Sequence, residues 1–284
     1  MTPAPLTTTD HNRTIAGLTY IYPVMSRRAG GLSIGVNFNI NNACNWRCLY
    51  CQVPNLIIGS APELNKELLE KELRFFLNEV LHGSFYDDYQ VPPQQRVIKD
   101  IALSGNGEPT SLANFAEAIT LIGDIGRELG VLPKSRFILI TNGSLIHLPK
   151  VQAGLQVFNQ YNGEVWFKLD SATVEGKKRI NNAAQNCEAG LNNLLLASQL
   201  CTTKVQTCLV NFDKQGFSET ERNALLNTLQ IVKAKSIIKE IMLYTIARKS
   251  YQPEAVKLSP LSVDIMNQFA DEIRALGFEV SVNV

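Results

Sequence analysis

Three cysteines within eight residues constrain this chain more than any other feature of its sequence. Cys44, Cys48 and Cys51 have the spacing C-x3-C-x2-C, and they are half of the six cysteines in the 284 residues. In a sequence that shows no secretion signal, closely spaced cysteines are typical of metal ligands rather than of disulfides. We therefore expect this stretch to bind a metal ion or a metal cluster.

The number of available ligands separates the possible metals. A structural zinc site takes four ligands, and none of the three histidines, His11, His82 and His147, lies near this stretch of sequence. A [4Fe–4S] cluster held by three thiolates keeps one iron open, and an open metal position is where a catalytic site binds its substrate or cofactor. A zinc knuckle, or thiols that only fill the core, is the alternative.

Composition excludes several classes of protein. Hydrophobic residues make up 45% of the chain and charged residues 19%, as in ordinary globular proteins. The net charge of +1, from 27 basic and 26 acidic residues, argues against a strong nucleic-acid footprint. No apolar run has the length of a membrane span. We therefore expect a cytoplasmic protein that does not enter membranes.

Hydrophobic periodicity predicts an α/β fold. Strand-like segments alternate with helical segments about six times, which is typical of a parallel sheet with crossover helices. We expect an open, partial (β/α)6 TIM-type barrel over residues 19–284, after a flexible tail over residues 1–18. The expected strands are 32–40, 97–103, 136–140, 165–170, 204–211 and 237–246, and the main expected helices are 61–81, 151–161, 186–201, 219–234 and 261–276.

Polar residues follow the expected strands, where parallel α/β folds place their sites. The cysteine stretch follows the first strand, and the turn Gly105–Glu108 follows the second. Asn142, Lys168 and Arg248 stand at or just after the ends of later strands. Lys168 and Asp170 share one face of their strand, because side chains repeat every two residues. A purely structural Lys168–Asp170 pair is the alternative.

The cysteine spacing, with Tyr50 just before the last cysteine, resembles the signature of the radical SAM superfamily. The turn Gly105-Asn106-Gly107-Glu108-Pro109 resembles the G-G-E-P motif of that superfamily, with Asn106 in place of a glycine. The resemblance implies a partial barrel, a [4Fe–4S] cluster and S-adenosylmethionine (SAM). It also implies reductive cleavage of SAM to a 5′-deoxyadenosyl radical, which abstracts hydrogen from a substrate.

The resemblance also implies roles for single residues. The three cysteines would hold the cluster and act in catalysis through it. Lys168 could contact the carboxylate of SAM, and Asn142 and Asp170 could contact its ribose. Met242 could lie beside the adenine, and a core residue is the alternative. The residues expected to contact SAM are Tyr50, Gly105, Asn106, Gly107, Glu108, Asn142, Lys168, Asp170 and Met242.

Within the superfamily the sequence is similar to the wyosine-synthase-like branch. The similar segments include 23–28, 35–37, 104–110, 141–144 and 179–181. The chain has no cysteine before Cys44, whereas wyosine-type enzymes carry further cysteines there. Cys187, Cys201 and Cys208 form no metal motif and are expected in the core.

The substrate is left open by the sequence. Arg27, Arg28 and Arg248 are candidates for contacting it, which would suit an RNA base or another anionic molecule. Solvated charges are the alternative, and for Arg27 and Arg28 this is the more common case. A one-electron reductant of the flavodoxin or ferredoxin type is the expected partner. The alternative functions are an activase for a glycyl-radical enzyme and a non-catalytic metal-binding interaction module.

Overall fold

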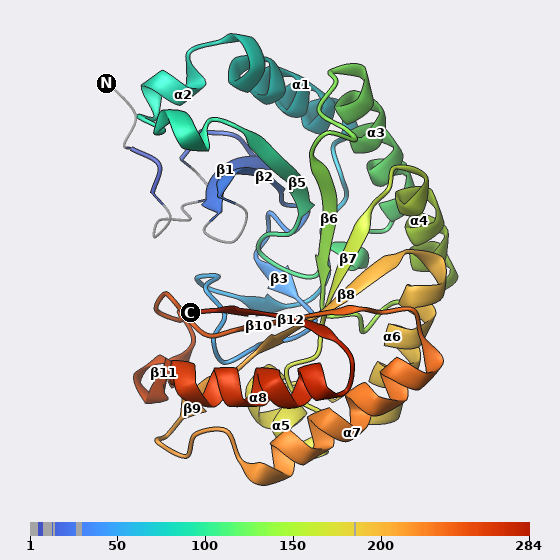
Figure 1. The fold of residues 1–284 in the computed structure, drawn as a ribbon. Helices are drawn as coiled ribbons and strands as arrows, with labels where there is room; N and C mark the ends of the chain where they lie inside the picture. Colours follow the sequence, from blue (N-terminus) through green and yellow to red (C-terminus); the bar gives the residue numbers. More distant parts are fainter. Residues whose placement is uncertain (1–4, 8–12, 14, 27–29, 185) are drawn as a thin grey trace.

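A curved eight-stranded sheet with helices on its outer side forms the body of the molecule (Figure 1). The structure, a computed structural model, describes residues 5–7, 13, 15–26, 30–184 and 186–284. The strand order is β1-β2-β5-β6-β7-β8-β10-β12. The strands are β1 (Ile21–Ser26), β2 (Gly31–Val36), β5 (Ile98–Leu103), β6 (Arg136–Thr141), β7 (Glu164–Lys168), β8 (Thr202–Cys208), β10 (Glu240–Tyr244) and β12 (Glu279–Asn283).

All neighbouring strands from β2 to β12 are parallel, and β1 pairs with β2 in the antiparallel sense. In the described part of the chain β1 and β12 are the two edges of the sheet and do not pair with each other. The sheet is therefore an open, partial barrel, as the sequence predicts. The antiparallel strand β1 widens it on the side where the chain begins.

One long helix connects each parallel strand to the next. The helices are α1 (Lys66–His82), α3 (Phe115–Glu128), α4 (Pro149–Gln160), α6 (Cys187–Leu200), α7 (Glu219–Lys235) and α8 (Val263–Ala275). Side chains of Asn65, Asn186, Ser218 and Ser262 accept backbone N–H bonds at the starts of α1, α6, α7 and α8. Each such cap contributes about 1 kcal/mol to helix stability. The caps fix where four of the six connecting helices begin.

Short elements fill the connections. They are α2 (Phe85–Asp88), α5 (Val174–Gly176), the 3-10 turns η1 (Pro93–Gln95), η2 (Pro109–Ser111) and η4 (Pro253–Lys257), and the π-helical turn η3 (Lys177–Asn181). Two small two-stranded sheets pair β3 (Ala43–Cys44) with β4 (Ile57–Ile58), and β9 (Val210–Phe212) with β11 (Leu258–Pro260).

The alternation of side chains along each strand separates the core from the inside of the barrel. Ile101, Phe137 and Val165 face outward and belong to the large core between the sheet and the helices. Their neighbours Ala102 and Ile138 face inward and belong to a separate apolar cluster. The inward face of the sheet is therefore available to form a site, while the outward face holds the fold together.

Four predicted strands end at earlier residues in the structure. The strands expected over 165–170 and 237–246 end at Lys168 and Tyr244. The strand expected to continue to residue 40 ends at Val36, because the side chain of Asn37 accepts a hydrogen bond from the backbone N–H of Asn39 and turns the chain. The strand expected over 204–211 is divided into β8 and β9. All four differences lie at the carboxyl ends of strands.

The first described residues contact the body of the protein, although residues 1–18 are expected to form a flexible tail. Leu6 is buried in the main core, and its backbone N–H donates to the carbonyl of Tyr89 at 3.1 Å.

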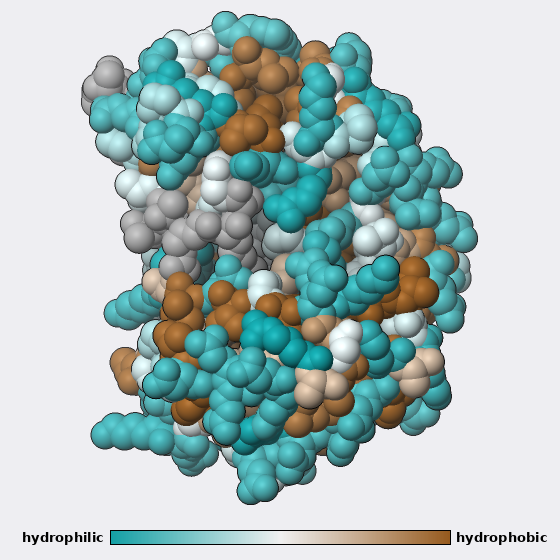
Figure 2. All heavy atoms as spheres, in the orientation of Figure 1, coloured by the Kyte–Doolittle hydropathy of each residue, from teal (hydrophilic) through white to brown (hydrophobic). Residues whose placement is uncertain are grey.

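At the other end of the chain, hydrophobic side chains reach the surface beside the C-terminus, along the edge strand β12 (Figure 2). No helix in the described ranges is long and apolar enough to cross a membrane.

Candidate active site

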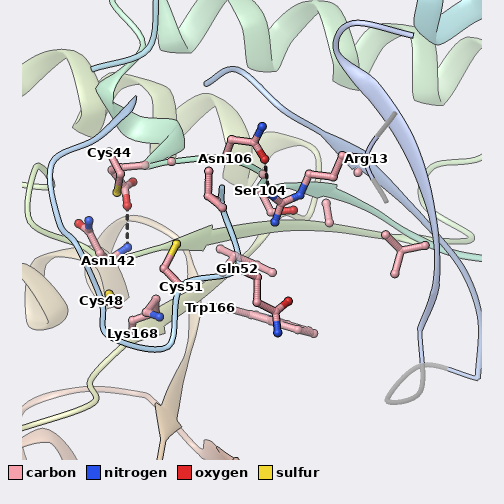
Figure 3. Close-up of a pocket in the computed structure, with 18 of the residues that line it drawn as sticks. Arg13, Cys44, Cys48, Cys51, Gln52, Ser104, Asn106, Asn142, Trp166 and Lys168 are labelled. Atoms are coloured by element: carbon pink, nitrogen blue, oxygen red, sulfur yellow. Dashed lines mark hydrogen bonds between the residues drawn. The ribbon is translucent and has the colours of Figure 1, made fainter. Parts of the chain in front are cut away.

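A cavity of about 390 Å³ lies on the inward face of the sheet and contains most of the predicted site (Figure 3). Its wall includes Cys44, Cys48 and Cys51 from one loop, and residues from seven of the eight strands. It extends down β5 from Ser104 to Asp100, which is about 13 Å along a strand. The predicted residues that line it are Cys44, Cys48, Tyr50, Cys51, Gly105, Asn106, Gly107, Glu108, Asn142, Lys168 and Arg248.

Local hydrogen bonds shape the start of the cysteine loop. The side-chain amide of Asn39 donates to the carbonyl of Ala43 at 2.9 Å, and that of Asn42 donates to the carbonyl of Pro54 at 3.1 Å. Asn42 has a left-handed backbone with φ of 56°, which asparagine tolerates better than most residues. The parallel pairing of β3 with β4 then closes the loop on itself. Cys44 is the last residue of β3, so this pairing fixes the first cysteine.

Distant segments hold the rest of the loop. Arg47 makes two hydrogen bonds of 2.8 Å to the carboxylate of Glu254. The hydroxyl of Ser250 donates to the carbonyls of Leu49 and Cys51 at 2.8 and 3.0 Å. The cysteine loop is therefore held against the segment that follows β10.

The three thiols are suited to a cationic cluster. All three are free and half-buried. Burial raises the pKa of Cys44 to about 12, although the backbone N–H of Trp46 opposes this. Burial also raises the pKa of Cys48, against the effect of Lys168. A bound metal deprotonates coordinating thiols, so coordination would oppose the effect of burial on Cys44 and Cys48.

The arrangement of the thiols separates a cluster from a single ion. Among the described residues, no three His, Cys, Asp or Glu side chains converge as they would around one metal ion. A [4Fe–4S] cluster binds each thiolate to a different iron, so its ligands stand around a larger body. All three thiols line the same cavity.

The glycine-rich turn after β5 approaches the cysteine loop closely. A Cβ atom on Gly107 would lie 2.0 Å from the carbonyl oxygen of Ala43, and Gly105 has a φ of 138°. Both positions therefore require glycine. Asn106 is instead anchored, because its backbone N–H donates to Asn37 at 2.9 Å and its side-chain amide donates to Asn42 at 2.7 Å.

Asn106 also connects the turn to the start of the chain. Its side-chain oxygen accepts a hydrogen bond from Arg13, drawn in Figure 3. The Arg13 guanidinium lies 5.7 Å from the centre of the Tyr22 ring and lines the cavity. The asparagine that departs from the glycine of the motif thus brings a cation to the cavity wall.

Glu108 joins the ends of two strands. One of its carboxylate oxygens accepts hydrogen bonds from the backbone N–H and the hydroxyl of Thr110 and from the hydroxyl of Thr141, at 2.6 to 3.1 Å. The other accepts from the backbone N–H of Asn142 at 2.7 Å. Burial raises the pKa of Glu108, and these hydrogen bonds oppose that rise. The second oxygen keeps acceptor capacity for a ligand.

A buried network lies behind the last two cysteines. Lys168 donates to the hydroxyl of Tyr50, which donates to the carboxylate of Asp170. The Lys168 ammonium is also 3.5 Å from that carboxylate. Burial lowers the pKa of Lys168, but Asp170 and the nearby Tyr244 outweigh it and raise that pKa well above its usual value. Burial raises the pKa of Tyr50, and the nearby charge of Asp170 adds to this rise.

Two predicted contacts, Asp170 and Met242, do not line the cavity. Asp170 is fully buried behind the wall, and its oxygens accept from Tyr50, from Asn181 and from the backbone N–H of Cys208. The structural Lys168–Asp170 pair is therefore formed. Met242 belongs to the apolar cluster of the inner face but not to the cavity wall. Arg27 and Arg28 lie outside the described residues.

Sequence reasoning missed the lower part of the cavity. Asp100 and Trp166 are buried residues of its wall, and Ser33 donates a hydrogen bond to Asp100. The alternation of side chains along the strands contained a signal. Trp166 stands two places before Lys168 on β7, and Asp100 stands four places before Ser104, which also lines the cavity. The further lining residues include Tyr22, Val24, Ser26, Gly35, Ala102, Ile138, Ile140 and Gln206.

Sequence comparison finds relatives for part of this chain. No family model matches the chain. A UPF0026 protein of Helicobacter pylori is 26% identical over 180 residues, which are 63% of this chain and 51% of that protein. The chain therefore spans about half the length of this curated relative.

Solved structures of radical SAM enzymes share the fold. TYW1 with a lysine–pyruvate adduct bound superposes with a TM-score of 0.56 at 16% identity, over 86% of this chain and 73% of that one. A radical SAM methyltransferase from Sphaerobacter thermophilus superposes with a TM-score of 0.59 at 13% identity, over 92% and 67% of the two chains. The similarity to the radical SAM superfamily that the cysteine motif predicts is thus confirmed for the fold. This chain has the partial-barrel fold of radical SAM enzymes.

Proposed function

We propose that this chain is a radical SAM enzyme that binds a [4Fe–4S] cluster through Cys44, Cys48 and Cys51 and binds SAM in the same cavity. The observation that carries the proposal is the meeting of three free thiols, the glycine-rich turn and Lys168 on one cavity wall. They come from a loop and two strand ends that are distant in sequence. A zinc knuckle would need a fourth ligand beside the loop, and it would not need the cavity.

The residues of the wall supply complementary groups for SAM. The ammonium of its methionine part would meet the free acceptor capacity of Glu108 and the backbone carbonyls of the turn. The Lys168 ammonium would meet its carboxylate, and the side chain of Asn142 its ribose. Because these groups are fixed by hydrogen bonds within the protein, they would bind SAM with little loss of side-chain freedom.

The chemistry that the cluster and SAM supply when bound is one-electron cleavage of SAM to a 5′-deoxyadenosyl radical, which abstracts a hydrogen atom from the substrate. The inner apolar residues Ala102, Ile138 and Trp166 would keep water from the reacting groups. The electron would come from a one-electron reductant of the flavodoxin or ferredoxin type. Arg13 and Arg248 on the wall favour a substrate with an anionic group, such as a nucleotide of RNA.

The proposal is tested by metal analysis and spectroscopy of anaerobically reconstituted protein. We expect about four irons and four sulfides per chain, as a [4Fe–4S] cluster requires, and a change in the electron paramagnetic resonance (EPR) spectrum of the reduced cluster when SAM is added. A colourless zinc protein would contradict the proposal. A cluster whose spectrum ignores SAM would favour the metal-binding interaction module instead.

A further inference from the structure

Asn181 is a buried polar residue that the proposed function has not used. It is 1% exposed and is the last residue of η3, the π-helical turn between β7 and α6. Its side-chain nitrogen lies 3.3 Å from the sulfur of Cys48 and 2.8 Å from a carboxylate oxygen of Asp170. An amide nitrogen has two hydrogens, so it can donate one to each of these atoms.

The orientation of the Asn181 amide is determined by its neighbours. Both atoms near the nitrogen are hydrogen-bond acceptors, namely the Asp170 carboxylate and the Cys48 sulfur. A flipped amide would place its oxygen against both acceptors and lose both hydrogen bonds. The Asp170 carboxylate is itself held by Tyr50 and by the backbone N–H of Cys208. The amide therefore presents an N–H group to the sulfur.

The backbone of the same turn fixes the cysteine loop on both sides of Cys48. The backbone N–H of Arg47 donates to the carbonyl of Asn181 at 3.2 Å, and that of Leu49 donates to the carbonyl of Ile180 at 2.8 Å. Isolated π-helical turns occur frequently at functional sites. Here the turn holds the backbone around Cys48 and the side chain beside its sulfur in one unit.

We propose that Asn181 is a positioning residue whose hydrogen bond to the Cys48 sulfur raises the reduction potential of the cluster. This inference rests on the proposed function, because it requires a cluster on Cys48. Hydrogen bonds to the sulfurs are among the factors that set the potentials of Fe–S clusters. The reduced cluster carries one more negative charge than the oxidised one, so a donor to its sulfur stabilises the reduced form more.

The experiment compares reconstituted wild-type protein with three variants. Asn181→Leu and Asn181→Asp have similar size to the native residue and lack the N–H donor. Ser250→Ala is the matched control, because Ser250 also holds the cysteine loop but through the carbonyls of Leu49 and Cys51 and not through a sulfur. The measurements are iron content and the midpoint potential, determined by dithionite titration with mediators and EPR detection.

We expect both Asn181 variants to disfavour reduction about tenfold, a fall in midpoint potential of about 59 mV for a one-electron couple. Ser250→Ala should keep the wild-type potential in whatever cluster it retains. A potential in Asn181→Leu equal to that of wild type would overturn the inference and leave the proposed function intact. Loss of the cluster from both Asn181 variants would also overturn it, since Asn181 would then hold the cluster rather than tune it. A wild-type protein without a cluster would overturn both proposals.

Discussion

At the scale of single residues, Glu108 shows how one carboxylate can organise two strand ends and a ligand site together. It accepts hydrogen bonds from Thr110, Thr141 and the backbone of Asn142. Thr110 belongs to η2, Thr141 is the last residue of β6, and Asn142 follows it. Removing the carboxylate would leave buried donors without an acceptor, at a cost of about 1 to 3 kcal/mol for each.

Glu108→Ala should weaken SAM binding at least tenfold and leave the iron content nearly unchanged. The reason is that Glu108 lies on the proposed SAM side of the cavity, and its hydrogen bonds go to Thr110, Thr141 and Asn142 rather than to the thiols. Equilibrium dialysis of reconstituted protein with labelled SAM measures the affinity. Unchanged affinity in this variant would remove Glu108 from the proposed site.

The three cysteines make a second prediction at this scale. Cys44→Ala, Cys48→Ala and Cys51→Ala should each lose most of the bound iron, because each removes one of three ligands. Cys187→Ala is the control, since Cys187 begins α6 and does not line the cavity. Iron and sulfide analysis after reconstitution checks this. A variant of the triplet with full iron content would contradict the ligand assignment.

Some site residues could be predicted from sequence and others could not. The cysteines, Glu108 and Lys168 belong to short motifs or to strand ends, so local reasoning finds them. Asn181 meets Cys48 across 133 residues of sequence, and Ser250 meets Leu49 across 201. Nothing in the local pattern of either residue indicates these contacts, because they arise only when the barrel brings the segments together.

At the scale of elements, the cysteine loop is held by pieces of the chain on opposite sides. The β3–β4 pair fixes its start, η3 holds its middle, and the segment after β10 holds its end. The Arg47–Glu254 pair belongs to the last of these contacts, and its side chains are 30% and 28% exposed. A pair with this exposure contributes up to about 1 kcal/mol.

The Arg47–Glu254 pair predicts a dependence on pH. The hydrogen bond from Arg47 lowers the pKa of Glu254 below its usual value. A group with a lowered folded-state pKa stabilises the fold above its unfolded pKa, and that stability is lost as the pH falls through the folded pKa. Wild-type protein should therefore have a higher melting temperature than Glu254→Gln at neutral pH, and the gap should close in acid. A difference in melting temperature that stays constant with pH would show that the charge of Glu254 does not stabilise the fold.

At the scale of the whole molecule, one face of the sheet stabilises the fold and the other forms the candidate site. Its outer face packs against the helices in the main core, and its inner face lines the cavity. This division follows from the alternation of side chains in strands, so the strands and helices could be predicted from the sequence. The antiparallel pairing of β1 with β2 and the contact of Arg13 with Asn106 could not, because they depend on how the chain begins to pack.

Phe158 tests this division. It is fully buried on α4, and the centre of its ring lies 4.5 Å from the centre of the Phe137 ring on the outer face of the sheet. Phe158→Ala should destabilise the protein by about 3 to 5 kcal/mol without changing SAM affinity at temperatures where the variant is folded. Urea unfolding and SAM dialysis measure the two quantities. A large loss of SAM affinity in the folded variant would show that the two faces are coupled.

The production of 5′-deoxyadenosine tests the central claim most directly. Reconstituted protein is incubated anaerobically with SAM and dithionite, and the product is separated by chromatography. We predict 5′-deoxyadenosine from the wild-type protein and none from Cys48→Ala. The absence of product from wild-type protein with a full and reducible cluster, even with candidate anionic substrates present, would contradict the assignment of radical SAM chemistry to this cavity.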